Sequence, residues 1–168
     1  MNRKIAIIGG GNLGTAMAEG LLKSKFSKAS DITVTRRNTS INPLKPLGIE
    51  IINDNHAAVK KSDVIVLAVK PFQTIELLKT IKKEISADQV LISVVTGVTM
   101  EEIEGAIDKK VSLFRAMPNT AISIRESMTC LCHRHAKQQD INYVHELFGK
   151  LGKVVFIDEN LMEAATIL

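Results

Sequence analysis

The chain has 168 residues, of which 45% are hydrophobic and 24% are charged. This length and composition are typical of one globular domain with a substantial core, and they exclude an intrinsically disordered chain. The net charge is +4, and lysine pairs are spread along the sequence without forming one cluster; only 4% of the residues are aromatic, and there is no tryptophan. A nucleic-acid surface, which needs clustered basic residues and aromatic stacking platforms, is therefore not predicted.

No stretch of the sequence predicts a membrane span or a secretory leader. The most apolar run, residues 64–69, is far shorter than the roughly 20 residues that a membrane helix needs. The four apolar residues after Arg3 and Lys4 are too few for the core of a signal peptide. We expect a cytoplasmic protein with a small-molecule ligand.

The first predicted elements are a strand at residues 5–8 and a helix at 15–22, joined by a glycine-rich turn. The turn contains Gly9, Gly11 and Gly14 in the spacing G-x-G-x-x-G. In a dinucleotide site the first glycine permits a tight turn, the second admits the pyrophosphate to the backbone, and the third lets helix and strand pack closely. No Gly-Lys-Ser/Thr follows, which excludes a P-loop for nucleoside triphosphates.

A second strand is predicted at residues 32–35, and two arginines, Arg36 and Arg37, follow it. In folds that prefer NAD, an acidic residue at this point binds the ribose 2′-hydroxyl, whereas a basic residue accommodates a 2′-phosphate. Guanidinium groups bind phosphate in a bidentate manner, so NADP(H) is predicted in preference to NAD(H). The alternative is a pair of solvent-facing loop arginines.

The middle of the chain alternates strands with helices. Strands are predicted at 49–52, 64–69, 90–95, 111–114, 128–132 and 153–157, and the intervening helices at 55–61, from Pro71 onward, 99–107 and 137–151. This alternation predicts an α/β fold with a doubly wound, mostly parallel sheet of the Rossmann type. In such folds ligands bind outside the carboxyl ends of the strands, so the glycine turn, Arg36, Lys70, Thr96 and Asn119 should converge on one crevice.

Two cysteines and two histidines lie close together in the sequence, at Cys130, Cys132, His133 and His135. If this segment is a strand, both cysteines point to one face and His133 to the other, because side chains alternate along a strand. The four side chains then do not converge. We therefore predict buried thiols at a strand end and no metal site.

The last segment predicts a helix that is cut off. A capped apolar helix starts near Leu161, and only about two turns of it remain.

Motifs outside the glycine turn are similar to those of the pyrroline-5-carboxylate reductase family. They are Ala68-Val69-Lys70-Pro71, Gly97-Val98-Thr99, Arg115-x-Met117-Pro118-Asn119-Thr120, and the closing Leu147-Phe148-x-x-x-Gly152 with Leu161-Met162-x-Ala164-x-Thr166. The resemblance runs through the whole chain. It departs from the family pattern at Ala121, where proline is usual, and at Ser127, where glycine is usual, so the loop between them is expected to follow a different path.

The resemblance implies reduction of the cyclic imine 1-pyrroline-5-carboxylate to L-proline, in proline biosynthesis, with NADPH or NADH. It also implies which residues contact the cofactor. These are Ile8 to Leu13 at the pyrophosphate, a range that includes Gly9, Gly11 and Asn12, then Arg36 and Asn38 near the adenosine ribose, and Asn55, Ala68, Val69, Lys70, Pro71, Val94, Val95 and Thr96 toward the nicotinamide. Gly14 and Arg37 join them as cofactor residues from the glycine spacing and the arginine pair described above. Asn119 and Thr120 are expected on the substrate side.

The resemblance implies a dinucleotide-binding domain at residues 1–157 and, at residues 158–168, the start of a truncated helical domain. In the family this helical domain continues beyond the position of Leu168, forms homo-oligomers and completes the substrate site. The main proton donor is therefore expected beyond Leu168, and the catalytic residue is unassigned within this chain, which alone should be inactive. Lys70 and Asn119 lie where they could assist, or they could merely shape loops. Two other functions stay open: another imine or 2-hydroxyacid reductase, and a non-catalytic NADP-binding sensor or partner-binding module.

Overall fold

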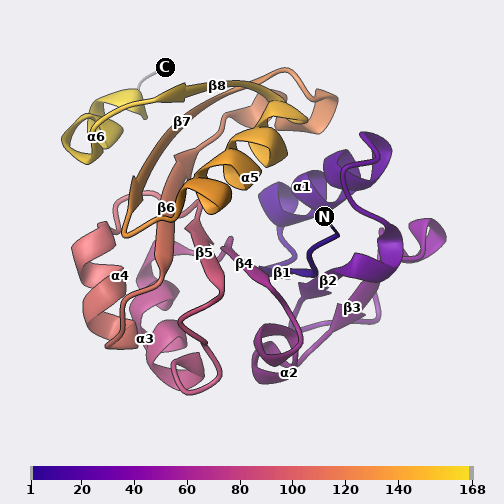
Figure 1. The fold of residues 1–168 in the computed structure, drawn as a ribbon. Coiled ribbons are helices and arrows are strands. Elements are labelled where there is room, and N and C mark those ends of the chain that lie inside the picture. Colours follow the sequence, from indigo (N-terminus) through magenta and orange to yellow (C-terminus); the bar gives the residue numbers. More distant parts are fainter. Residues whose placement is uncertain (1, 167–168) are drawn as a thin grey trace.

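The computed structural model describes residues 2–166, and its central feature is one eight-stranded sheet (Figure 1). The strand order is β3-β2-β1-β4-β5-β6-β7-β8. The strands are β1 (Ile5–Ile8), β2 (Ile32–Thr35), β3 (Glu50–Ile52), β4 (Val64–Leu67), β5 (Val90–Ser93), β6 (Ser112–Met117), β7 (Ser127–Arg134) and β8 (Gly152–Phe156). The helices are α1 (Asn12–Lys23), α2 (Asn55–Lys60), α3 (Pro71–Ile81), α4 (Met100–Ile107), α5 (Gln138–Gly149) and α6 (Met162–Ala165), with short 3-10 turns at Ala29–Asp31, Lys45–Leu47, Thr120–Ile124 and Glu159–Leu161.

Strands β1 to β6 are parallel, as predicted for a doubly wound fold. The first strand lies at the switch point, because Ile5 pairs with Ile32 on one side and with Val64 on the other. This is the place at which the strand order reverses, and in open α/β sheets a ligand crevice forms there. The predicted fold class is confirmed.

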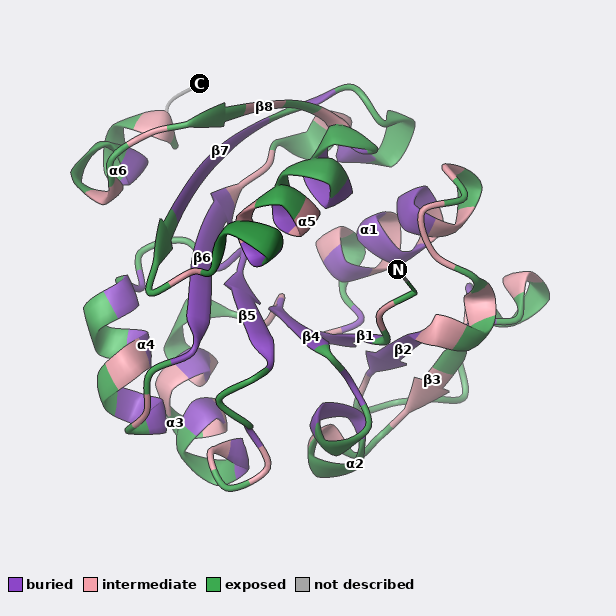
Figure 2. Ribbon diagram, viewed as in Figure 1, coloured by how far each residue is buried: buried purple, intermediate pink, exposed green. Residues whose placement is uncertain are grey.

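Helices cover both faces of the sheet, and the alternation of side chains along each strand divides the core in two. Ile5 and Ile7 point into a core that α1 and α5 cover, whereas Ala6 and Ile8 point into a second core under α2, α3 and α4. The central strands are buried along their whole length, but β8 at the sheet margin is largely exposed (Figure 2). The apolar runs of the central strands therefore follow from burial on both faces.

Several predicted boundaries are wrong by two or three residues, and the shifts lie at the crevice. Helix α1 begins at Asn12 and not at residue 15, directly after Gly11. Strands β4 and β5 end at Leu67 and Ser93, two residues before the predicted ends, where the parallel ladders of β1 with β4 and of β4 with β5 stop. The apolar residues 68–69 and 94–95 consequently belong to the connections that follow these strands.

The sheet reverses direction at β7, which runs antiparallel to β6, and β8 is parallel to β7. Met117 at the end of β6 pairs with Cys130, whereas β7 begins at Ser127. The β7–β8 pair therefore extends beyond the carboxyl edge of β6 and forms a wall above it (Figure 1). Strand β6 itself is longer than the predicted 111–114, because β7 supplies partners as far as Met117.

The chain end packs back against the domain. The predicted helix 161–168 is a 3-10 turn followed by α6, and Met162 is completely buried in the second core. Residues 167–168 of that prediction lie outside the described residues. Among residues 2–166, no helix has the length and apolarity to cross a bilayer.

An ion pair joins the amino-terminal residues to α5. Arg3 Nη1 lies 2.9 Å from Asp140 Oδ1, and its guanidinium carbon lies 4.4 Å from the centre of the Tyr143 ring. The other carboxylate oxygen of Asp140 accepts a hydrogen bond from Ser112 Oγ at 2.6 Å. These contacts fix α5 against the amino ends of the strands.

Candidate functional site

A cleft of about 1080 Å³ follows the carboxyl edge of the parallel strands. Most of the predicted cofactor residues line it: Ile8, Gly9, Gly11, Asn12, Leu13, Arg36, Arg37, Asn55, Ala68, Val69, Lys70, Pro71, Val94, Val95 and Thr96. Gly10, inside the predicted range 8–13, also lines it, whereas Thr35, Asn53 and residues of α3 line it and were not predicted. Residues from the ends of five strands, β1 to β5, therefore meet around one elongated space.

The three motif glycines meet different structural demands. Gly9 has φ of +114°, and a Cβ there would lie 2.5 Å from the carbonyl oxygen of Ala68. A Cβ on Gly14 would lie 2.1 Å from the carbonyl oxygen of Gly9, so Gly14 supports close packing of helix and turn and does not line the cleft. A Cβ on Gly11 would meet no atom within 4 Å and would enter the open cleft.

Gly11 is also the N-cap of α1, and no side chain of the described residues caps this helix. The N–H groups of its first turn, together with the positive end of the helix dipole, favour an anionic ligand there. The glycine turn thus offers backbone donors and free space at the same point. That combination fits a pyrophosphate.

The two arginines lie at the β2 end of the cleft, and both line it. Arg36 is partly buried, and its Nη1 donates to the carbonyl oxygen of Ile41 at 3.3 Å, while Arg37 is exposed. Asn38 does not line the cleft, and its side-chain oxygen accepts hydrogen bonds from the backbone N–H and the hydroxyl of Ser40. Of the described lining residues, Glu76 on α3 alone carries a carboxylate.

A second cavity, of about 660 Å³, adjoins the cleft at the end away from the arginines. Asn12, Leu13 and Thr96 line both spaces. The other lining residues are Ala16, Met117, Pro118, Asn119, Thr120, Ile122, Ser123, Met128, Cys130, Ala165 and Thr166, and none of these described residues carries a charge. The predicted substrate-side residues Asn119 and Thr120 therefore lie where the cofactor cleft opens into a mostly apolar space.

Asn119 shapes the loop that follows β6. Its side-chain oxygen accepts a hydrogen bond from the N–H of Ala121, and its own N–H donates to Ser127 Oγ at 3.1 Å. The hydroxyl of Ser127, where the family usually has glycine, thus stabilises the turn. Lys70 is exposed and precedes α3 as its N-cap, next to Phe72, which lines the cleft and is 83% exposed.

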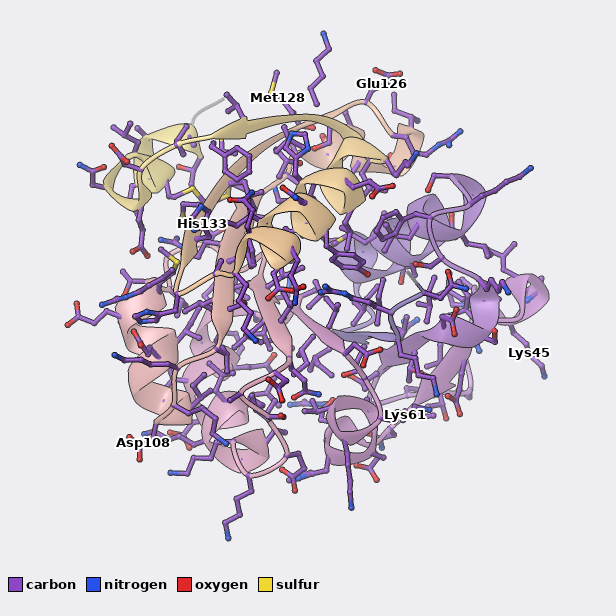
Figure 3. All side chains as sticks on the ribbon, viewed as in Figure 1. Lys45, Lys61, Asp108, Glu126, Met128 and His133 are labelled. Atoms are coloured by element: carbon purple, nitrogen blue, oxygen red, sulfur yellow. The ribbon has the colours of Figure 1, made fainter. Side chains whose placement is uncertain are left out.

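The cysteine and histidine side chains do not converge, as predicted. Cys130 and Cys132 face the second core, whereas the His133 ring lies on the other side of β7, 5.8 Å from the centre of the Phe114 ring (Figure 3). His135 pairs with Glu104 on α4. Within residues 2–166, no group of three or more His, Cys, Asp and Glu side chains has the arrangement of a metal site.

Comparison with known proteins gives a family match and several relatives. Residues 4–97 match a family model described as NADP oxidoreductase coenzyme F420-dependent. The chain is 37% identical over 177 residues to pyrroline-5-carboxylate reductase 1 of Dictyostelium discoideum, and the match covers 98% of this chain and 32% of that protein.

Two solved structures share the fold. The structure of a pyrroline-5-carboxylate reductase from Coxiella burnetii has a TM-score of 0.94 and 29% identity, covering 100% of this chain and 64% of the other. The pyrroline carboxylate reductase of Plasmodium falciparum, solved with NADP bound, has a TM-score of 0.90 and 25% identity, covering 98% of this chain and 61% of the other. The resemblance inferred from the motifs is confirmed, and the chain spans less than two thirds of each of these proteins.

Proposed function

This chain belongs to the family described as coenzyme F420-dependent NADP oxidoreductases, and on that premise we propose that it is the cofactor-binding part of a pyrroline-5-carboxylate reductase. The reductase converts 1-pyrroline-5-carboxylate to L-proline with NADPH. The observation that carries the proposal is one continuous space with three chemically distinct parts. A basic end, a glycine turn and an uncharged cavity follow one another along the carboxyl edge of the sheet.

These parts match the sequence of groups in the cofactor. Arg36 and Arg37 bind the 2′-phosphate, and the N–H groups at the start of α1 bind the pyrophosphate at Gly11. The nicotinamide then extends toward Thr96, where the cleft meets the second cavity. The preference for NADP(H) over NAD(H) rests on the two arginines and on the absence of an acidic residue directly after β2.

The uncharged cavity suits an imine as the electron acceptor. When bound, the nicotinamide supplies hydride to the imine carbon. The described cavity walls surround the cyclic imine with a surface that is mostly apolar. They contain no carboxylate that would take the proton from the imine nitrogen. The chain thereby positions the reactants, and residues outside this chain complete the substrate site and the homo-oligomer.

The test separates binding from turnover. We expect this chain to bind NADPH, measured by the change in nicotinamide fluorescence, and to consume no NADPH when 1-pyrroline-5-carboxylate is added. A chimera that joins it to the carboxyl-terminal region of the Dictyostelium reductase should consume NADPH with that substrate. Failure of the chain to bind NADPH would refute the proposal, whereas binding with an inactive chimera would favour a non-catalytic NADP-binding module.

A further inference from the structure

A buried ion pair connects β6 with the segment after β8. Arg115 is only 2% exposed, and its Nη1 lies 3.1 Å from Oε1 of Glu159. A guanidinium group stays charged in a protein, so its burial requires a partner of opposite charge. In the described part of the chain Glu159 is the only acidic residue that forms an ion pair with Arg115, and Nη2 of the arginine has no hydrogen-bond partner there.

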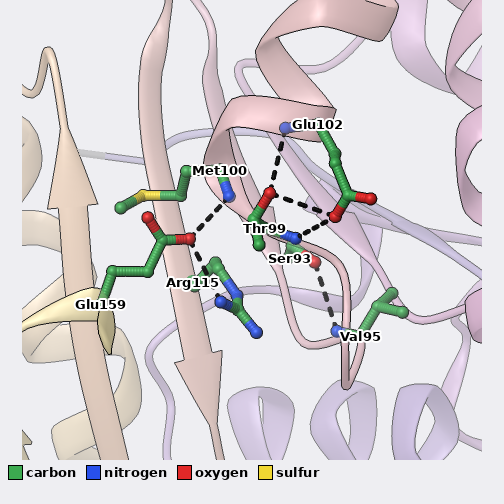
Figure 4. A network of polar contacts seen from close by, with 7 residues as sticks. All are labelled: Ser93, Val95, Thr99, Met100, Glu102, Arg115 and Glu159. Atoms are coloured by element: carbon green, nitrogen blue, oxygen red, sulfur yellow. Dashed lines mark hydrogen bonds and ion pairs between the residues drawn. The ribbon is translucent and has the colours of Figure 1, made fainter. Parts of the chain in front are cut away.

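The same carboxylate oxygen holds the start of α4. Glu159 Oε1 accepts a hydrogen bond from the N–H of Met100 at 2.7 Å, in addition to its contact with Arg115 (Figure 4). Within α4, Thr99 and Glu102 form a reciprocal capping box. Glu159 therefore satisfies a free N–H group at a helix start from a segment that is distant in sequence.

Met100 ends the connection that begins after β5 and contains Thr96. At the near end of this connection, the N–H of Val95 donates to Ser93 Oγ at 3.2 Å. At the far end, Glu159 holds Met100. Thr96, which lines both the cleft and the cavity, lies between these two attachments.

Glu159 also determines the position of a second cavity wall. It begins the 3-10 turn that leads into α6, where Met162 is completely buried and Ala165 lines the same cavity as Thr96. The carboxylate of Glu159 thus links the loop between β5 and α4 to the segment that leads into α6. Arg115, held in the sheet, fixes that carboxylate in place.

We infer that Glu159 is a positioning residue that sets the geometry of the nicotinamide end of the cleft by holding Thr96 and α6 at a fixed separation. The inference rests on the proposed function, because that function assigns the nicotinamide to the Thr96 end. Glu159 lines neither the cleft nor the cavity, so its replacement should affect only how the nicotinamide half of the cofactor binds. The adenosine half, at the arginine end, lies outside its reach.

The experiment compares two ligands on Glu159→Gln, which keeps an oxygen acceptor but removes the charge that holds Arg115. The ligands are NADPH and 2′,5′-ADP, which carries the adenosine and its 2′-phosphate but no nicotinamide. We expect the affinity for NADPH to fall about tenfold and the affinity for 2′,5′-ADP to stay unchanged. Isothermal titration calorimetry measures both on the 168-residue chain.

Glu104→Gln is the matched control, because Glu104, on the helix α4 whose start Glu159 contacts, also pairs with an arginine, Arg134 at 3.2 Å, but does not hold the Thr96 connection. It should leave both affinities unchanged. If Glu159→Gln does not fold, Glu159→Asp keeps the charge and withdraws the carboxylate from Met100, and the same split is expected. Unchanged NADPH affinity, or equal loss for both ligands, overturns the inference. Failure of the unaltered chain to bind either ligand instead refutes the proposed function.

Discussion

Replacing Gly14 with alanine should destabilise the domain, whereas the same change at Gly11 should leave it folded and block ligand binding. The new Cβ at position 14 would lie 2.1 Å from the carbonyl oxygen of Gly9 and 3.1 Å from a methyl carbon of Ile7. Both contacts are to buried or turn-forming atoms that cannot rotate away, so α1 must move from the strand. Overpacking of this kind costs about 3 kcal/mol.

A loss of that size lowers the melting temperature by roughly 6–12 °C in a domain of this length. At Gly11 the added methyl group meets no atom within 4 Å, and the backbone angles, φ −77° and ψ −164°, suit alanine. Its cost should be at most about 1 kcal/mol, from the poorer N-cap. The methyl group would nevertheless occupy the space assigned to the pyrophosphate, and NADPH affinity should fall more than about tenfold.

Thermal unfolding followed by circular dichroism, together with NADPH titration, measures both effects. Gly105→Ala is the control, since a Cβ there also meets nothing within 4 Å, in the middle of α4 and away from the cleft. It should raise stability by about 0.5–1 kcal/mol and leave binding unchanged. A Gly14→Ala protein as stable as the unaltered chain, or a Gly11→Ala protein that binds NADPH normally, would show that the two glycines do not have these separate roles.

Three further outcomes are expected. Replacing both Arg36 and Arg37 with alanine should weaken the binding of NADPH by about 1–3 kcal/mol and change the binding of NADH little, as measured by fluorescence titration. Equal loss of affinity for both cofactors would contradict a 2′-phosphate site. Arg3→Ala should cost about 3 kcal/mol in urea denaturation, because it leaves the buried carboxylate of Asp140 unpaired. Adding Asp140→Asn to it should restore part of that stability, and no recovery would argue against the ion pair as the cause. Burial, with the charge of Glu159, raises the pKa of Cys132 to about 11, so at pH 8 only about one thiol in a thousand is ionised, and iodoacetamide should label Cys132 in urea but not in the native protein. Rapid native labelling would contradict that pKa.

Local patterns in the sequence were sufficient to predict the fold class and most of the cleft. The motif alone accounts for Gly9, which the turn geometry requires, and for Gly14, which the close packing of helix and turn requires. The predicted strands extended too far, to Val69 and Val95, for a local reason: an apolar residue just beyond the end of a strand cannot be distinguished by type from one inside it. Where the ladder stops depends on the neighbouring strand, which the pattern of one segment does not contain.

The second cavity and its supports were harder to predict because they arise from distant contacts. Cys130 and Ala165 line the same space as Thr96, but they come from β7 and α6. The pairing of Arg115 with Glu159 has no periodicity that a sequence pattern could reveal. An arginine within an apolar strand was the available signal, because a buried guanidinium requires an acidic partner somewhere in the fold.

The position of β1 between β2 and β4 also bears on how the domain folds. Both partners of Ile5, Ile32 and Val64, follow it at long range, and parallel strands cannot be joined by a tight hairpin. The first strand therefore gains its ladder only after two large loops have closed, and such closures make folding slow. No short segment of the chain can form the crevice beside the glycine turn, because the crevice forms only after those loops have closed.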